Sequence, residues 1–99
     1  MKDLESIREE IDKIDEEIVG LFEKRMEMVQ QIANHKEKYN QPILHKDREQ
    51  EVLTKCKAKL SNKDFEKELE ELFECVMKIS RRTQTKLLNT NKDIEINKY

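Results

Sequence analysis

Apolar residues recur three and four positions apart from Leu4 to Tyr39, a spacing that places them on one face of a single long α-helix. A helix from about Asp3 to Lys38 would be about 50 Å long, whereas a compact domain of this chain length has a radius of gyration of about 13 Å. The rest of the chain is therefore too short to cover this helix. We expect a second copy of the chain to pack against it. The face comprises Leu4, Ile7, Ile11, Ile14, Ile18, Leu21, Met28, Ile32 and Tyr39.

The composition favours one all-α domain. The 99 residues include 42% charged residues, one glycine and one proline, and no alternating β-branched run is present. Pro42 interrupts the helical pattern and predicts a loop. A second helix is expected from His45 or Lys46 to about Leu60, and a third from about Lys63 to Asn89. The domain would span residues 1–89, with a flexible tail over residues 90–99.

Several classes of protein are disfavoured. No apolar stretch approaches the roughly 20 residues of a membrane span, and the chain opens directly into the amphipathic pattern, without a secretory signal. A net charge of −2 argues against nonspecific nucleic-acid binding. Cys56 and Cys75 fall at apolar helical positions and are expected to be reduced core residues of a cytoplasmic protein. They lack the paired histidines of a zinc site, so no metal is expected.

Polar residues interrupt the apolar faces of all three predicted helices. Each has an ordinary explanation, such as an ion pair between Arg25 and Glu49 or a serine bonded to its own helix. Together they supply two cations, one anion and two neutral hydrogen-bonding groups. The interior of a helical bundle is where such convergent sites are built, so we expect an anion-binding site here. The residues are Arg25, Lys36, Glu49, Ser80 and Gln84.

Arg8 flanks the same face of the first helix. It lies 17 positions before Arg25, which is about 25 Å along the helix axis, so both cannot hold one small ligand from the same helix. An antiparallel partner helix could bring the second copy's Arg8 to the site. An exposed ion pair with Glu5 or Asp12 is the competing explanation.

The chain resembles the all-helical class of chorismate mutases over about residues 4–88. The similarity rests on R-x-x-I-D-x-I-D from Arg8, on Arg25 and Lys36, on P-I-x-x-x-D-R-E from Pro42, and on S-x-x-T-Q from Ser80. The resemblance implies an intertwined helical homodimer without metal or cofactor, which converts chorismate to prephenate on the route to phenylalanine and tyrosine. Each of its two sites would borrow one arginine from the other subunit.

The resemblance also implies roles for individual residues. Arg25 and the partner subunit's Arg8 would bind the two carboxylates of chorismate. Lys36 would contact a carboxylate and the ether oxygen, and Gln84 would donate to the same ether oxygen. The rearrangement is unimolecular, so holding a flexible dianion in a compact pose and stabilising charge on the ether oxygen are what the protein must supply.

The remaining implied contacts concern the ring hydroxyl and a carboxylate. Glu49 would accept a hydrogen bond from the hydroxyl, with Arg48 supporting it, and Ser80 would lie near a carboxylate. His45 departs from the family pattern, in which an acidic residue precedes D-R-E. Hydroxyl recognition or pH dependence would differ here if that acidic charge matters, and little would change if only its backbone binds.

Two other functions stay open at this level. One is a lyase on the same fold that releases pyruvate from isochorismate. The other is a non-catalytic helical dimer that acts as a regulatory or interaction module, in which the basic run KISRRTQTK would be a contact patch. Such a module would have no reason to place Arg25, Lys36 and Gln84 on apolar faces.

Overall fold

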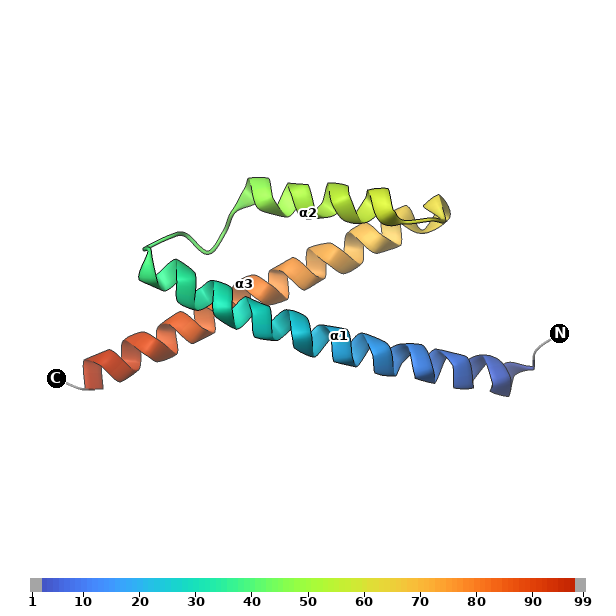
Figure 1. Ribbon diagram of the computed structural model, residues 1–99, viewed down its shortest axis with the longest axis horizontal. Helices are drawn as coiled ribbons and strands as arrows, with labels where there is room; N and C mark the ends of the chain where they lie inside the picture. The colour runs from blue at the N-terminus through green and yellow to red at the C-terminus, as the bar shows by residue number, and fades with distance from the viewer. Residues whose placement is uncertain (1–2, 98–99) are drawn as a thin grey trace.

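The structure, a computed structural model, describes the backbone of residues 3–97 and the side chains of residues 3–89. Within this part of the chain it contains helices α1 (Leu4–Lys38), α2 (Lys46–Lys59) and α3 (Glu66–Asn97), a short 3-10 helix η1 (Lys63–Phe65), and no strand. The predicted all-α fold is confirmed. Helix α3 packs against both α1 and α2, crossing α1 while α2 lies along its first half (Figure 1).

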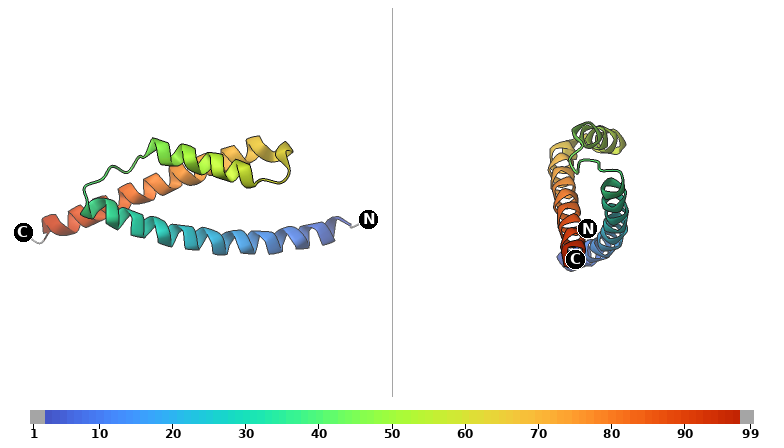
Figure 2. Two further views of the ribbon diagram at one scale, coloured as in Figure 1. Left: turned by 45° about the horizontal axis from the view of Figure 1, so that its top comes forward. Right: turned by 90° about the vertical axis from the view of Figure 1, so that its left-hand side faces the viewer.

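Helix α1 begins where the carboxylate of Asp3 accepts a hydrogen bond from the backbone N–H of Ser6 at 2.8 Å. This cap satisfies one of the free N–H groups of the first turn, and its hydrogen bonds lower the pKa of Asp3. The first half of the helix diverges from α2 and α3 (Figures 1 and 2). Every described residue up to Lys24 is exposed, and Ile11, Ile14 and Ile18 are 48%, 54% and 56% exposed. One chain alone therefore leaves most of the predicted apolar face uncovered.

Directly after α1 the chain reverses direction and runs back beside the last turns of that helix. Asn40 adopts a left-handed conformation, with a φ of 52°. The N–H of Gln41 donates to the carbonyl of Lys36 at 2.8 Å, and the N–H of Asn40 donates to that of Glu37 at 3.3 Å. This is a Schellman motif, which asparagine tolerates because its short polar side chain suits the left-handed region. Pro42 follows directly and prevents the helix from continuing.

His45 caps helix α2. Its Nδ1 accepts a hydrogen bond from the backbone N–H of Arg48 at 3.0 Å, which is the role that Ser, Thr, Asp or Asn usually takes. The apolar side of α2 faces α3 and is half-buried, and an ion pair of 3.0 Å between Lys57 and Glu70 joins the two helices. This face consists of Val52, Leu53, Cys56 and Leu60.

Helix α3 differs from the prediction at both ends. Asn62 caps the η1 turn, and α3 proper begins at Glu66 instead of near Lys63. The helix continues to Asn97, past the predicted end at Asn89, because no glycine or proline stops it and each added residue gains a backbone hydrogen bond. Residues 98 and 99 lie outside the described part, and the flexibility of residues 90–99 stays a prediction.

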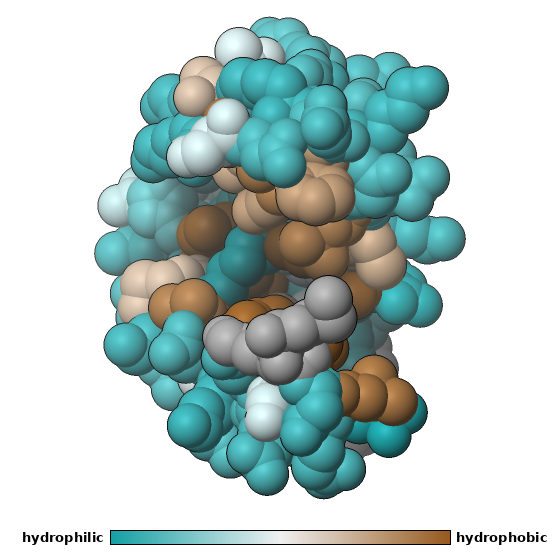
Figure 3. All heavy atoms as spheres, turned by 90° about the vertical axis from the view of Figure 1, so that its right-hand side faces the viewer, coloured by the Kyte–Doolittle hydropathy of each residue, from teal (hydrophilic) through white to brown (hydrophobic). Residues whose placement is uncertain are grey.

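An apolar groove of about 410 Å³ lies between α1 and α3, beside the region where the two helices pack together. Figure 3, which views the end that carries the start of α1, shows apolar side chains gathered in the middle of a hydrophilic rim. Leu72 lines the groove and is 56% exposed. Cys75 is also exposed, so its prediction as a core residue is wrong for the single chain. The reason is that α2 and α1 cover only part of α3. The groove is lined by Ile18, Leu21, Phe22, Arg25, Met26, Leu72, Phe73, Cys75, Val76 and Ile79. Among the described residues, no helix has the length and apolar character needed to cross a membrane.

Candidate active site

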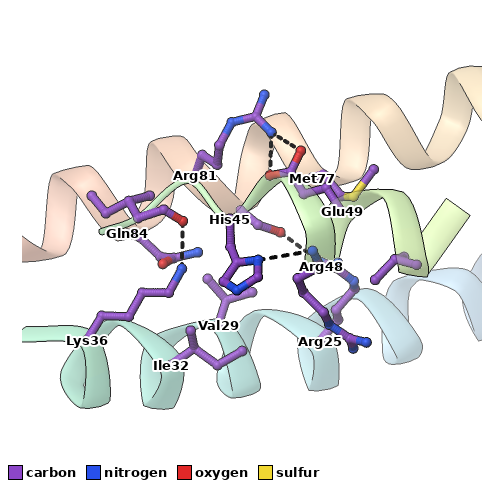
Figure 4. Close-up of a pocket in the computed structure, with 13 residues that line it drawn as sticks. Arg25, Val29, Ile32, Lys36, His45, Arg48, Glu49, Met77, Arg81 and Gln84 are labelled. Atoms are coloured by element: carbon purple, nitrogen blue, oxygen red, sulfur yellow. Dashed lines mark hydrogen bonds and ion pairs between the residues drawn. The ribbon is translucent and has the colours of Figure 1, made fainter. Parts of the chain in front are cut away.

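A cavity of about 150 Å³ lies where α1, α2, α3 and the loop before α2 meet (Figure 4). Its apolar wall comes from Val29, Ile32, Ile43, Val52 and Met77. Its polar side chains are Arg25, Lys36, His45, Arg48, Glu49, Ser80, Arg81 and Gln84. Seven of the eight residues that the sequence predicts for the site therefore line one cavity. Arg8 is the exception.

Arg25 bridges α1 and α3. Its Nη1 donates a hydrogen bond to the hydroxyl of Ser80 at 2.5 Å, and that hydroxyl donates to the carbonyl of Val76 at 2.9 Å. Burial lowers the pKa of Arg25, the nearby charge of Arg48 lowers it further, and Cys56 acts in the opposite direction. A guanidinium nevertheless stays charged in proteins, so Arg25 is a fixed, partly desolvated cation.

Lys36 lies three turns further along α1. Its Nζ donates to the carbonyl of Ile43 at 2.6 Å, an acceptor that the chain reversal after α1 brings within reach. Burial lowers the pKa of Lys36, and the negative charge of Glu49 offsets part of that shift. The ammonium has three donor positions, and Ile43 uses one of them.

Glu49 projects from the first turn of α2 and meets Arg81 of α3. The Nη1 of Arg81 donates to both carboxylate oxygens, at 2.6 Å for Oε2, and both side chains are partly buried. In the sequence, Arg81 stands out only as a member of the basic run KISRRTQTK. Its position four residues after Met77 and three before Gln84 puts it on the flank of their face, which is the signal that could have found it.

Ser80 and Gln84 are buried, with 7% and 6% exposure. Ser80 is held by the two hydrogen bonds described above, whereas the Oε1 of Gln84 has no hydrogen-bond partner among the described residues. An unpaired buried amide oxygen is uncommon and calls for an explanation. Figure 4 shows the Gln84 side chain beside Lys36, at the end of the cavity opposite Arg25.

His45 and Arg48 form the α2 edge of the cavity. Because the Nδ1 of His45 accepts a backbone hydrogen bond, the neutral ring carries its proton on Nε2. Arg48 forms an ion pair with Glu51 at 3.2 Å, and its side chain is 59% exposed. Its charge is therefore screened by solvent and partly balanced by that carboxylate.

Arg8 does not line the cavity. It is exposed on the half of α1 that α2 and α3 leave uncovered. Its separation from Arg25 is about 25 Å along the helix axis, so it reaches no cavity of its own chain that contains Arg25. Any role of Arg8 in the site requires a second copy.

The electrostatic balance of the cavity favours a small anion. Four residues of the lining are cationic (Arg25, Lys36, Arg48 and Arg81) and one is anionic (Glu49), so the polar lining is cationic overall. The apolar wall lowers the local dielectric constant, which strengthens the attraction for an anion. The arrangement can bind carboxylates at Arg25 and Lys36 and can present hydrogen-bond donors and an acceptor between them.

Comparison with known proteins identifies the family to which the chain belongs. The family model for chorismate mutase type II matches residues 7–85. A bifunctional chorismate mutase/prephenate dehydratase of Buchnera aphidicola is 42% identical over an alignment of 91 residues, which covers 88% of this chain and 23% of that protein. Its namesake in Aquifex aeolicus is 42% identical over 55 residues, or 56% of this chain and 15% of that protein.

The T-protein of Haemophilus influenzae is 41% identical over 49 residues, or 50% of this chain and 13% of that protein. The chain thus spans less than a quarter of the length of these curated relatives. No solved structure matches it. Because the family model covers most of the 99 residues, the chain belongs to the chorismate mutase type II family.

Proposed function

We propose that this chain is a chorismate mutase, which converts chorismate to prephenate in the biosynthesis of phenylalanine and tyrosine. The observation that carries the proposal is the placement of Arg25, Lys36 and Gln84 from two helices around one partly desolvated cavity. Family membership and the names of the relatives support the same activity.

The reaction breaks one C–O bond as one C–C bond forms within the same molecule. In the proposed mechanism Arg25 clamps one carboxylate of chorismate, because a guanidinium binds a carboxylate with two parallel hydrogen bonds. Lys36 and Gln84 donate to the ether oxygen, on which negative charge grows as the C–O bond breaks. Donors fixed in advance stabilise that charge more than they stabilise the ground state, which lowers the barrier.

The other residues of the cavity would orient the substrate. Glu49 accepts a hydrogen bond from the ring hydroxyl, and Arg48 supports the same end of the molecule. Ser80 holds Arg25 by a hydrogen bond and lies near the substrate carboxylate that Arg25 binds. His45 offers its Nε2–H from the edge of the cavity, where it can donate to a carboxylate or to the hydroxyl.

We propose further that the active form is a homodimer in which each cavity receives Arg8 of the partner subunit. The exposed apolar residues of α1 and the groove between α1 and α3 support this assembly, because a second long helix would cover both. The second carboxylate of chorismate would then be bound by an arginine that the single chain lacks at its own site. Two free cysteines fit a reducing, cytoplasmic location.

Product analysis tests the proposed activity. Purified protein is incubated with chorismate and, separately, with isochorismate, and prephenate and pyruvate are quantified. Prephenate from chorismate supports the mutase. Pyruvate from isochorismate, without prephenate from chorismate, would move the assignment to the lyase. A folded dimer that turns over neither compound would favour a non-catalytic module.

A further inference from the structure

Arg81 has no part in the mechanism above, although it lines the cavity and pairs with Glu49. A single guanidinium nitrogen of Arg81 donates to both oxygens of Glu49 across the space between α3 and α2. The two side chains are 33% and 25% exposed, so the pair is less screened than a surface ion pair. Charge-assisted hydrogen bonds of this kind fix the geometry of the carboxylate.

Lys36 is the competing partner for Glu49. Both residues line the same cavity, and the charge of Glu49 offsets part of the lowering of the Lys36 pKa by burial, yet Lys36 donates to the carbonyl of Ile43. A partly buried carboxylate that loses its cation is strongly driven to find another. Of the two α1 cations that line the cavity, Lys36 is the one on which the charge of Glu49 acts, so it is the cation that Glu49 would bind without Arg81. Such a pair would withdraw from the substrate the donor that the proposed mechanism assigns to the ether oxygen.

The pair also leaves Glu49 able to accept a further hydrogen bond. An ionised carboxylate offers about four acceptor positions, and Arg81 occupies one on each oxygen. The remaining positions are suited to a hydroxyl donor.

We propose that Arg81 is a positioning residue that binds and neutralises Glu49, and thereby keeps Lys36 available to the substrate. This inference rests on the proposed chorismate mutase activity. Arg81 acts through Glu49 and need not touch the reacting atoms.

The neighbouring Arg82 provides a matched control. It follows Arg81 on α3 and is turned by about 100° around the helix. It is exposed and is not among the cavity residues. Arg82→Met removes the same charge and a similar volume from the same helix.

The test is a mutant cycle measured by the kinetics of chorismate turnover. We expect Arg81→Met to lower kcat/KM by about 100-fold, because it affects both the hydroxyl acceptor and Lys36, and Glu49→Gln to lower it by about tenfold. The double variant Arg81→Met/Glu49→Gln should return to the level of Glu49→Gln, since no carboxylate remains to capture Lys36. Arg81→Lys, which keeps the charge, should lie between Arg81→Met and wild type.

A role for Arg81 that does not involve Glu49 would give a different pattern, because the losses in the two single variants would then add in the double variant. If the wild-type protein turns over chorismate, additive losses would overturn the role proposed for Arg81 and leave the proposed function standing. An Arg81→Met variant as active as Arg82→Met would do the same. A wild-type protein without turnover would overturn the proposed function and this inference with it. Arg81→Gln gives the same comparison if circular dichroism shows that Arg81→Met is unfolded.

Discussion

The ammonium of Lys36 donates a hydrogen bond to the carbonyl of Ile43 at 2.6 Å and so joins the last turns of α1 to the loop that leads into α2. The Schellman motif at Asn40 makes this contact possible because it reverses the chain immediately after the helix. Lys36 is therefore held over the cavity by the same turn that sets the start of α2. Its protonation state should control activity.

Burial lowers the pKa of Lys36, so the ammonium loses its proton at a lower pH than an exposed lysine, whose pKa is about 10.4. We expect kcat/KM for chorismate to fall on the alkaline side below that value. The kcat profile should fall at higher pH than kcat/KM, because a bound dianion favours the ammonium. Lys36→Arg should abolish the alkaline fall, whatever its absolute rate. Persistence of the fall in Lys36→Arg would assign it to another group.

Gln84 is predicted to make the rate insensitive to pH between neutrality and mild acid, because an amide donates at any pH. Gln84→Glu should lower the rate at neutral pH by on the order of 10²-fold, since a carboxylate accepts hydrogen bonds and repels the charge growing on the ether oxygen. Its activity should recover as the pH falls and the carboxyl group gains a proton. Gln84→Ala is the control and should stay slow at all pH values. Equal pH profiles for the two variants would contradict the donor role.

His45 should contribute to stability through its cap on α2. His45→Ala removes the acceptor for the Arg48 N–H and is expected to lower the free energy of unfolding by about 1 kcal/mol. His45→Asn supplies another side-chain acceptor and should retain most of that stability. Urea denaturation at one fixed protein concentration measures both, and equal losses in the two variants would show that the cap contributes nothing.

The sequence predicted much of the candidate site because helical periodicity reveals a polar residue on an apolar face. Arg25, Lys36, Glu49, Ser80 and Gln84 stand out in this way, and the structure places all five around one cavity. Their contacts could not be predicted from spacing. The sequence allowed an ion pair between Arg25 and Glu49. In the structure Arg25 instead binds Ser80, and Glu49 binds Arg81.

Arg81 was not predicted because it lies at the edge of the apolar face of α3. At that edge the position of α2 determines whether a side chain lines the cavity or faces solvent. The packing angle between two helices is a tertiary property that the sequence of one helix does not specify. The end of α3 was also misplaced, since the loss of apolar periodicity after Asn89 indicates less packing but does not stop a helix. Leu72 and Cys75 follow the apolar pattern yet are exposed, because the pattern does not say which chain covers them.

Sharing of sites between subunits predicts complementation. Arg8→Ala and Arg25→Ala should each be nearly inactive as homodimers. After mixing and subunit exchange, about half of the dimers are mixed, and one of the two sites in each has both arginines, so about a quarter of wild-type activity should return. Unmixed samples at the same concentration are the control. No recovery, with mixed dimers verified by mass spectrometry, would place both arginines in the same subunit's site or remove Arg8 from it.

The most direct test of the account is the loss of chorismate absorbance with wild-type protein, Arg25→Ala and the neighbouring exposed-residue control Lys24→Ala. Arg25 is the partly buried cation that joins α1 to α3 in the cavity, whereas Lys24 is exposed beside it. We predict turnover by wild type and Lys24→Ala, and a loss of at least about 10²-fold in Arg25→Ala, whose folding is checked by circular dichroism. A folded Arg25→Ala variant as active as wild type, or a folded wild-type protein that leaves chorismate unchanged, would contradict the central claim.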